Sequence, residues 1–283
     1  MSRITTSLFI LLFITQQLSA AEHLPENDIF LLDLSVDFPE PINLSQHRGY
    51  NNQPAFSSDG MRVYYSRGDG EQTDIWYFDF ALEQIVRLTN TPESEYSPKP
   101  APHNNSISMV RVAMDGAQQL SLLNLDSGVF STLAEELDKV GYYSWFSGGS
   151  AAIFLLPEPF ELRLYASADE QLEVASNVGR SFHTHPITGQ LLYVDKTKAP
   201  WKVMAFSPTQ EKVEVASLFP NTEDFTISTS GTLWTALASK IYKRSESDTR
   251  WELVTDLRSF GITNISRLAV SPDESTLVLV NTR

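Results

Sequence analysis

The sequence predicts an all-β chain folded as a six-bladed β-propeller, in which four-stranded antiparallel blades surround a central axis. Three observations predict this fold. A pattern of four strand-like runs recurs every 38 to 45 residues, turn-forming segments separate the runs, and the two ends of the chain match complementary halves of one repeat. Repeats of this length with four strands each are typical of propeller blades.

Five repeats are complete. The first spans residues 53–91 and contains the runs PAFS, RVYYS, DIWYFDF and QIVRLT, separated by SDG, GDG and a polar turn. Asp and Gly favour tight turns for backbone reasons, so these residues need no functional explanation. The third run of each repeat is the clearest marker, and it begins at Ile75, Leu120, Leu162, Val203 and Ile241.

The two ends of the chain together supply a sixth blade. The segment at 267–283, RLAVSPDESTLVLVNTR, reads as the first half of a repeat, and the segment at 27–45 reads as the second half. DIFLLDL at 28–34 aligns with DIWYFDF at 74–80. We therefore expect DIFLLDL to pair with LVLVN, which closes the ring and removes two exposed strand edges.

Two segments could instead form amphipathic helices, at 81–88 (ALEQIVRL) and 132–140 (TLAEELDKV). The repeat places the first on a turn followed by a strand and the second in a connection between blades. A helical turn near Ala134 to Leu137, and a mixed α/β fold, remain as alternatives.

Residues 1–21 have the features of a secretory signal. Arg3 precedes an apolar run from Leu8 to Ile14, and Ser19, Ala20 and Ala21 provide small residues before a cleavage point. The run is too short to span a bilayer as a helix. We expect cleavage before Glu22, with cleavage next to Ala20 as the alternative, and a single propeller domain over 22–283.

Composition narrows the compartment and the partners. The chain has no Cys, so it has no lipid-attachment site, disulfide or thiolate chemistry, and we expect a periplasmic protein without a lipid anchor. Its net charge of −14 and its lack of basic runs disfavour nucleic acids and anionic membrane surfaces as partners. We expect a monomer that is not inserted in a membrane after cleavage.

The repeats also carry a family resemblance. AFSSDGMRVYYSRGDGEQTDIWYFDF and LAVSPDESTLVLVNTR resemble the W-S-P-D-G…D-I-Y-V-M-D-L repeats of TolB-like β-propellers. This resemblance implies an exported six-bladed propeller that binds proteins or cell-envelope components and has no chemistry of its own. The α/β domain that precedes the propeller of TolB has no counterpart in this sequence, so we expect a stand-alone propeller.

Catalytic signatures are sparse. The chain lacks G-x-S-x-G, the phosphate-binding G-x-x-x-x-G-K-[ST] and H-E-x-x-H, and we expect no cofactor and no metal. The segment SFHTHP places His183 and His185 two residues apart on a first strand, so both would project from one face and could share a metal or a catalytic role. Alternatively, both fill the blade-packing positions that Pro54 and Phe56 occupy in the first repeat.

Two acidic pairs, Glu93/Glu95 and Glu223/Asp224, would suit a glycosidase if each pair faced a cleft. The alternative is that they are solvated loop charges, which are common in a chain with 35 acidic residues.

The predicted binding surface is one mouth of the central channel. The segments that lead from the outer strand of one blade to the inner strand of the next all lie at the same end of the axis, and loops on a rigid scaffold often carry function. They combine aromatic and polar side chains as binding hot spots do. The predicted binding residues are Tyr50, Asn51, Asn52, Tyr96, Tyr142, Tyr143, Arg180, His183 and Asp224. The alternative is that the tyrosines only pack the junctions between blades.

These observations favour a protein-binding or scaffolding propeller that binds a cell-envelope protein or peptide, and they identify no catalytic residue. One alternative is a lyase or hydrolase that acts on a saccharide or peptide in the central funnel through His183 and His185. Another is a sensor of a small ligand.

Overall fold

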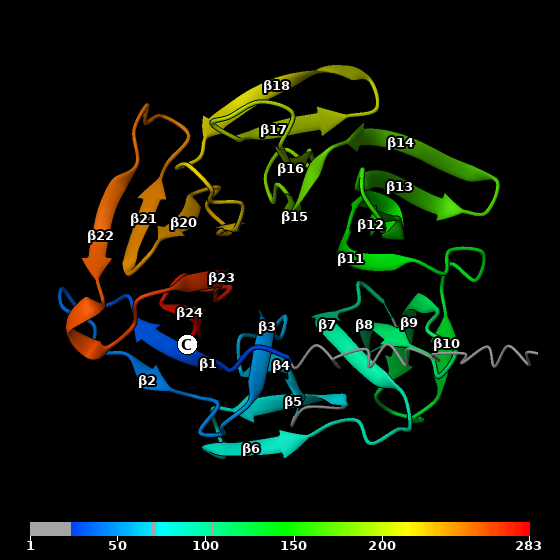
Figure 1. Cartoon of the computed structure of the whole chain (residues 1–283), viewed down its shortest axis with the longest axis horizontal. Helices are drawn as coiled ribbons and strands as arrows, with labels where there is room; N and C mark the ends of the chain where they lie inside the picture. The colour runs from blue at the N-terminus through cyan, green and yellow to red at the C-terminus, as the bar shows by residue number, and fades with distance from the viewer. Residues whose placement is uncertain (1–23, 69–71, 104) are drawn as a thin grey trace, which may run out of the picture.

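Short β-strands account for nearly all the regular structure of the computed structural model, which describes residues 24–68, 72–103 and 105–283. Within these residues the strands form six separate four-stranded antiparallel sheets arranged as a ring (Figure 1). The strands are β1 (Asn27–Asp33), β2 (Ile42–Asn43), β3 (Tyr50–Phe56), β4 (Arg62–Gly68), β5 (Thr73–Asp79), β6 (Gln84–Arg87), β7 (Ser94–Pro100), β8 (Ser106–Val112), β9 (Gln118–Asn124), β10 (Phe130–Thr132), β11 (Val140–Trp145), β12 (Ala151–Leu155), β13 (Glu161–Ser167), β14 (Glu170–Ser176), β15 (Val178–Thr184), β16 (Leu191–Asp195), β17 (Lys202–Ser207), β18 (Gln210–Ser217), β19 (Phe225–Ile227), β20 (Leu233–Leu237), β21 (Lys240–Arg244), β22 (Glu252–Asp256), β23 (Ile265–Val270) and β24 (Thr276–Thr282).

Each sheet is one blade. In five blades the strand that comes first in the chain lies nearest the axis, and in the sixth blade the innermost strand is β23. Five blades use four consecutive strands, from β3–β6 through β19–β22. The six inner strands are β3, β7, β11, β15, β19 and β23. We call the end of the channel where the inner strands begin the front mouth, and the end where they turn into the second strands the rear mouth. The predicted six-bladed fold is confirmed.

The sixth blade is built from both ends of the chain, in the order β2-β1-β24-β23. β1 pairs with β24 over seven residue pairs, from Asn27 opposite Thr282 to Asp33 opposite Thr276. Arg283, after the last strand, donates from Nε to Asp28 Oδ2 at 2.7 Å. The blue and red ends of the chain lie side by side in Figure 1. The strand that pairs with LVLVN is therefore DIFLLDL, as the repeats predict.

Apolar side chains fill the spaces between neighbouring blades. On one side of the sixth blade, Leu277 and Leu279 pack with Trp234 and Ile241 of the preceding blade. On its other side, Val278 and Val280 belong to a cluster that includes Tyr65 of the following blade. Alternate residues of β24 thus face opposite neighbours, because successive side chains of a strand point to opposite faces. Both faces of this blade are buried, so it links its two neighbours.

Neither of the two segments weighed as an alternative helix forms one. Residues 81–88 are a turn followed by β6. Near Ala134 the backbone makes a single turn, in which Leu137 N donates to Ala134 O at 2.9 Å. The alternative of a mixed α/β fold is wrong, since the helical segments of the described chain are two three-residue 3-10 turns, Ser147–Gly149 and Arg258–Phe260. In the described part of the chain, no helix is long and apolar enough to cross a membrane. The predicted signal at 1–21 lies outside the described residues.

Removing residues 22–45 should prevent stable folding, because it deletes β1 and β2 and leaves the edge of β24 without its seven paired residues. We expect insoluble protein, or protein that melts without cooperativity. Removing only residues 22–25, which precede β1, should leave the thermal transition unchanged. Circular dichroism melting of both variants tests this. A cooperative transition of the 46–283 chain near the full-length melting temperature would contradict it.

Candidate functional site: the central channel

The front part of the channel encloses a cavity of about 90 Å³. Every blade contributes to its wall. One polar or aromatic residue from each is, in chain order, Gln53, Lys99, Tyr142, Arg180, Asp224 and Arg267. All of these residues except Asp224 lie on inner strands, and Asp224 immediately precedes β19. The cavity is therefore a joint product of all six repeats.

Irregular pairing of the inner strands directs polar side chains into this cavity. The register shifts between Val178 and Phe182 in β15 and between Ile265 and Leu268 in β23, and these intervals contain Arg180 and Arg267. Bulges re-aim side chains and are frequent near functional sites. Gly179 permits the close packing beside Arg180, because a Cβ there would lie 2.9 Å from Val194 Cβ.

The bulges of β3 and β7 have a second unusual feature. They contain Gln53 and Ser97, whose φ angles are +57° and +54°. This left-handed conformation is uncommon for residues other than glycine, and such residues cluster at functional sites. Ser97 N donates to Gln53 Oε1 at 2.9 Å, and so does Ser66 Oγ at 2.8 Å. The two bulges are thus joined to each other beside the channel.

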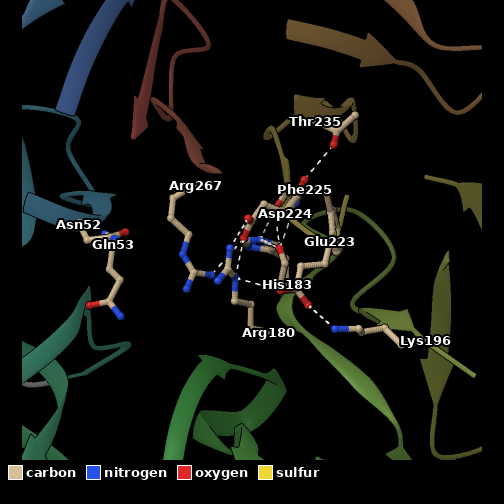
Figure 2. Close-up of polar contacts among 11 residues, drawn as sticks. Asn52, Gln53, Arg180, His183, Lys196, Glu223, Asp224, Phe225, Thr235 and Arg267 are labelled. Atoms are coloured by element: carbon tan, nitrogen blue, oxygen red, sulfur yellow. Dashed lines mark hydrogen bonds and ion pairs between the residues drawn. The ribbon is translucent and has the colours of Figure 1, made fainter. Parts of the chain in front are cut away.

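Asp224 is at the centre of an ion-pair cluster (Figure 2). Arg180 donates to both of its oxygens, at 2.7 Å from Nη2 and 3.2 Å from Nε. Arg267 Nη1 donates to Oδ1 at 3.1 Å. Burial acts to raise the pKa of Asp224, but Arg267 and Arg180 outweigh it and hold that pKa below its usual value. Asp224 is therefore a carboxylate at neutral pH.

Glu223 extends the cluster away from the axis. Its Oε1 lies 3.3 Å from Arg180 Nε, and its Oε2 accepts from Lys196 Nζ at 3.1 Å. The predicted pair Glu223/Asp224 therefore serves as the counter-charge for three cations. The pKa of Asp224 is lowered, whereas the general acid of a glycosidase has a raised pKa. For this pair, the geometry favours an ion-pair role over the glycosidase alternative.

The other predicted carboxylate pair is also committed to ion pairing. Glu95 is fully buried, accepts from Thr89 Oγ1 at 3.0 Å and lies 3.7 Å from Arg111 Nε. Burial raises the pKa of Glu95. Glu93 pairs with the same guanidinium. Glu95 is therefore not a solvated loop charge, whereas Glu93 is a partly exposed residue of the bend before β7. Neither lines the front cavity.

The two predicted histidines do not share a site. His183 lies in β15 beside the channel, and its Nε2 donates to the Phe225 carbonyl at 2.9 Å. Burial, together with the charge of Lys99, lowers the pKa of His183 to about 3, so the ring is neutral. Within residues 24–68, 72–103 and 105–283, no group of three or more His, Asp or Glu side chains is placed to hold a metal ion.

His185 lies beyond the end of β15, which corrects the prediction that both rings project from one strand face. The amides of Ile187 and Thr188 each donate to its Nδ1 at 3.2 Å. Its Nε2 therefore carries the proton and donates to Glu246 Oε1 at 2.8 Å. The ring thus stabilises the turn into β16 and lines a separate cavity between blades.

The predicted binding residues divide into two groups. Asn51 is fully buried and its Nδ2 donates to Asn27 O and His47 O, both at 2.9 Å, so it ties β3 to the sixth blade. Tyr143 is 1% exposed and donates to Ser97 O at 2.9 Å. Tyr50 is also buried. Tyr50 and Tyr143 therefore pack the junctions between blades, as the alternative for the tyrosines proposed. Asn51 is buried with them, and all three side chains are out of reach of a partner.

The remaining predicted residues keep partial exposure around the front mouth. They are Asn52, Tyr96, Tyr142, Arg180, His183 and Asp224. Tyr142 lies under Arg267, with the guanidinium carbon 4.9 Å from the ring centroid. Arg180 and Asp224 form the ion-pair cluster directly behind this aromatic residue.

The sequence pattern did not single out Lys99, Arg267, Gln53 or Ser97. For two of these residues a sequence signal was present. Gln53 and Ser97 each precede a proline, in the first runs QPAF and SPKP of their repeats. Lys99 is the most unusual of the four. Within the described residues no carboxylate pairs with it, and its Nζ lies 5.6 Å from the centroid of the Tyr143 ring. Burial, with Arg267 nearby, lowers its pKa to about 8.

Lys99→Met should stabilise the protein at pH 7 by about 1–3 kcal/mol, because a lysine pKa lowered in the folded state means that the fold disfavours the charged form. Between pH 8 and 10.5 the Lys99 ammonium loses its proton in the folded protein but keeps it in the unfolded chain. The free energy of unfolding of the wild-type protein should therefore rise with pH relative to that of the variant. The difference should therefore shrink over that range. Urea unfolding at pH 7 and pH 10 measures it. A difference that is the same at both pH values would contradict the assignment.

No protein-family model matches the sequence. A curated protein of Agrobacterium fabrum, described as uncharacterized, is 24% identical over 113 residues, which cover 38% of this chain and 38% of the relative. The matched stretch is therefore well under two thirds of that protein.

Solved structures are similar over most of the chain. A protein from Agrobacterium tumefaciens described as a TolB superimposes with a TM-score of 0.69 at 10% identity, over 92% of this chain and 99% of the other. TolB from Acinetobacter baumannii superimposes with a TM-score of 0.59 at 10% identity, over 92% of this chain but 64% of the TolB chain. A streptogramin B lyase superimposes with a TM-score of 0.55 at 12% identity, over 91% of this chain and 98% of the lyase chain. At these identities the similarity concerns the fold alone. The chain therefore has the six-bladed β-propeller fold of TolB-like proteins, as its repeat motifs indicate.

Proposed function

We propose that this protein is an exported binding propeller of the cell envelope, which captures a protein or peptide partner at the front mouth of its channel. The observation that carries this proposal is the composition of that mouth. Tyr96, Tyr142 and Asn52 are partly exposed around a fixed cluster of Arg180, Arg267 and Asp224. Aromatic and arginine side chains on a rigid frame are the residues that dominate binding energy at protein interfaces.

The charge of the mouth supports a selective surface. The chain as a whole has a net charge of −14. The front cavity, in contrast, is lined by the cations Lys99, Arg180 and Arg267 and by one carboxylate, Asp224. A local positive potential within an acidic surface orients a partner that carries negative charge. We therefore expect the captured segment to be acidic or to end in a carboxylate.

An enzyme that works through His183 and His185 has weaker support. The two rings line different cavities, and each spends its hydrogen bonds on backbone groups or on Glu246. A neutral His183 whose pKa is about 3 cannot protonate a leaving group near neutral pH. The lyase and TolB structures share only the fold with this chain, and one fold supports both binding and catalysis.

A capture experiment tests the partner surface. Tyr142→Ala should reduce capture of envelope proteins by the immobilised protein by at least about tenfold, the loss typical of a binding hot spot. Tyr96→Ala should reduce it in the same direction. Phe38→Ala is the matched control, because Phe38 is 91% exposed and lies in the β1–β2 connection at the opposite end of the axis. Quantitative mass spectrometry of the eluates gives the readout. Capture lost with Phe38→Ala and kept with Tyr142→Ala, while both variants stay folded, would place the partner elsewhere.

Export is tested separately. The full-length chain, expressed in a bacterium, should be recovered from the periplasmic fraction with an N-terminus at Glu22, because Ser19 to Ala21 provide the small residues that signal cleavage uses. N-terminal sequencing measures this. Replacement of Leu11 and Leu12 by Lys interrupts the apolar run and should retain the uncleaved chain in the cytoplasm. Recovery of uncleaved wild-type protein from the cytoplasm alone would contradict export.

A further inference from the structure

Two cavities meet inside the channel. The front cavity of about 90 Å³ and a wider cavity of about 450 Å³ at the rear mouth share four lining residues, Pro54, Lys99, His183 and Leu268. Of these four, Lys99 alone carries a charge at neutral pH, since the ring of His183 is neutral. A molecule that enters from the rear mouth therefore meets the Lys99 ammonium where the channel narrows.

The charges around this narrow point do not balance. Arg180 and Arg267 share the single carboxylate of Asp224, and Glu223 is divided between Arg180 and Lys196. Lys99 has no carboxylate partner among the described residues. An uncompensated ammonium in a concave, poorly solvated site attracts an anion more strongly than the same group on the surface does.

Neutral donors line the same front cavity as Lys99. Ser97 is 5% exposed, and its Oγ has no hydrogen-bond partner in the described chain, although buried hydroxyls normally have one. Gln53 uses its Oε1 to accept from Ser66 and Ser97 N, which fixes the amide and leaves its NH₂ group without a bond among the described residues. Figure 2 shows Gln53 across the channel from the Arg180 cluster. Both residues have a left-handed backbone, a conformation that persists only where the surrounding structure holds it.

The rear cavity offers an apolar wall beyond this polar group. Phe56, Trp145 and Ile227 line it. Trp145 is anchored, because its Nε1 donates to Ser108 Oγ at 2.9 Å. Ligand sites commonly combine such apolar walls with a few converging polar groups that fix orientation.

We propose that the channel binds an organic carboxylate, whose carboxylate group lies at Lys99, Ser97 and Gln53 and whose apolar body lies in the rear cavity. A carboxylate fits better than a phosphate. The guanidiniums that would hold phosphate in a bidentate manner are already engaged by Asp224, which leaves one ammonium and neutral donors for one negative charge. The inference goes beyond the proposed function, because it concerns the interior and rear of the channel rather than the partner surface at the front mouth.

Calorimetric titration of the folded full-length mature protein tests this site with a matched pair of probes, N-acetyl-L-phenylalanine and its amide. The acid should bind at least tenfold more tightly than the amide, because only the acid has the negative charge, and binding should change the fluorescence of Trp145. Equal affinity for the two probes, or no binding of the acid, would overturn the proposal.

A second arm identifies the source of the carboxylate. A pentapeptide that ends in phenylalanine is titrated with a free and with an amidated C-terminus. Preference for the free carboxylate in this arm indicates a chain terminus as ligand, and preference only in the first arm indicates a free small acid. Either result supports the site when the first arm shows a preference for the acid, and a lack of preference in the first arm overturns it.

Variants locate the carboxylate within the channel. Lys99→Met should weaken binding of the acid at least tenfold, while Lys202→Met should leave it unchanged. Lys202 is a suitable control because it is an exposed lysine that pairs with Glu214 on an outer hairpin. Unchanged affinity in Lys99→Met would overturn the assignment, and the comparison of acid and amide on the wild-type protein stands even if a variant fails to fold. Acid binding is measured without a partner and partner capture is measured without the acid, so failure of partner capture and failure of this site are distinguishable.

Discussion

The antiparallel ladder between β1 and β24 is the interaction on which the rest of the structure depends. A propeller blade cannot bury both faces alone, so each blade is stable only between two neighbours. In this chain the sixth blade exists only when the two ends pair, from Asn27 opposite Thr282 to Asp33 opposite Thr276. Arg283 and Asp28 add an ion pair at the same point. Closure of the ring therefore sets the spacing of all six inner strands and the width of the channel.

A closed ring of regular strands would present alternating side chains to the axis, and the bulges change this. In five inner strands the pairing shifts register near the front of the channel. The shifts turn Arg180, Arg267 and Gln53 toward the same small cavity. The cost is backbone strain at residues such as Gln53 and Ser97, which the surrounding blades hold in place. Chemistry in this fold thus depends on local departures from the repeat.

Charge is distributed unevenly between surface and channel. Acidic residues give the chain its net charge of −14, whereas the front cavity is lined by three cations and one carboxylate, Asp224. Burial strengthens the electrostatic interactions of these groups, because salt screens buried charges less than exposed ones. It also keeps His183 neutral and holds Lys99 near its titration point, with a pKa of about 8. The excess of positive charge in the channel favours the anionic ligand that we propose for it.

The sequence by itself determined the fold. Repeat length, turn residues and the match between its two ends predict six blades and the pairing of DIFLLDL with LVLVN, because strand alternation and turn chemistry are local properties. It also indicated the front mouth, where Tyr142, Arg180 and Asp224 do meet. Only the tertiary structure showed that Asn51 and Tyr143 are buried and that His185 lies beyond its strand. It also showed that, among the described residues, Lys99 has no carboxylate partner and the Ser97 hydroxyl has no hydrogen-bond partner. These properties depend on bulges and on contacts between blades that are distant in sequence, and a repeat pattern carries no information about either.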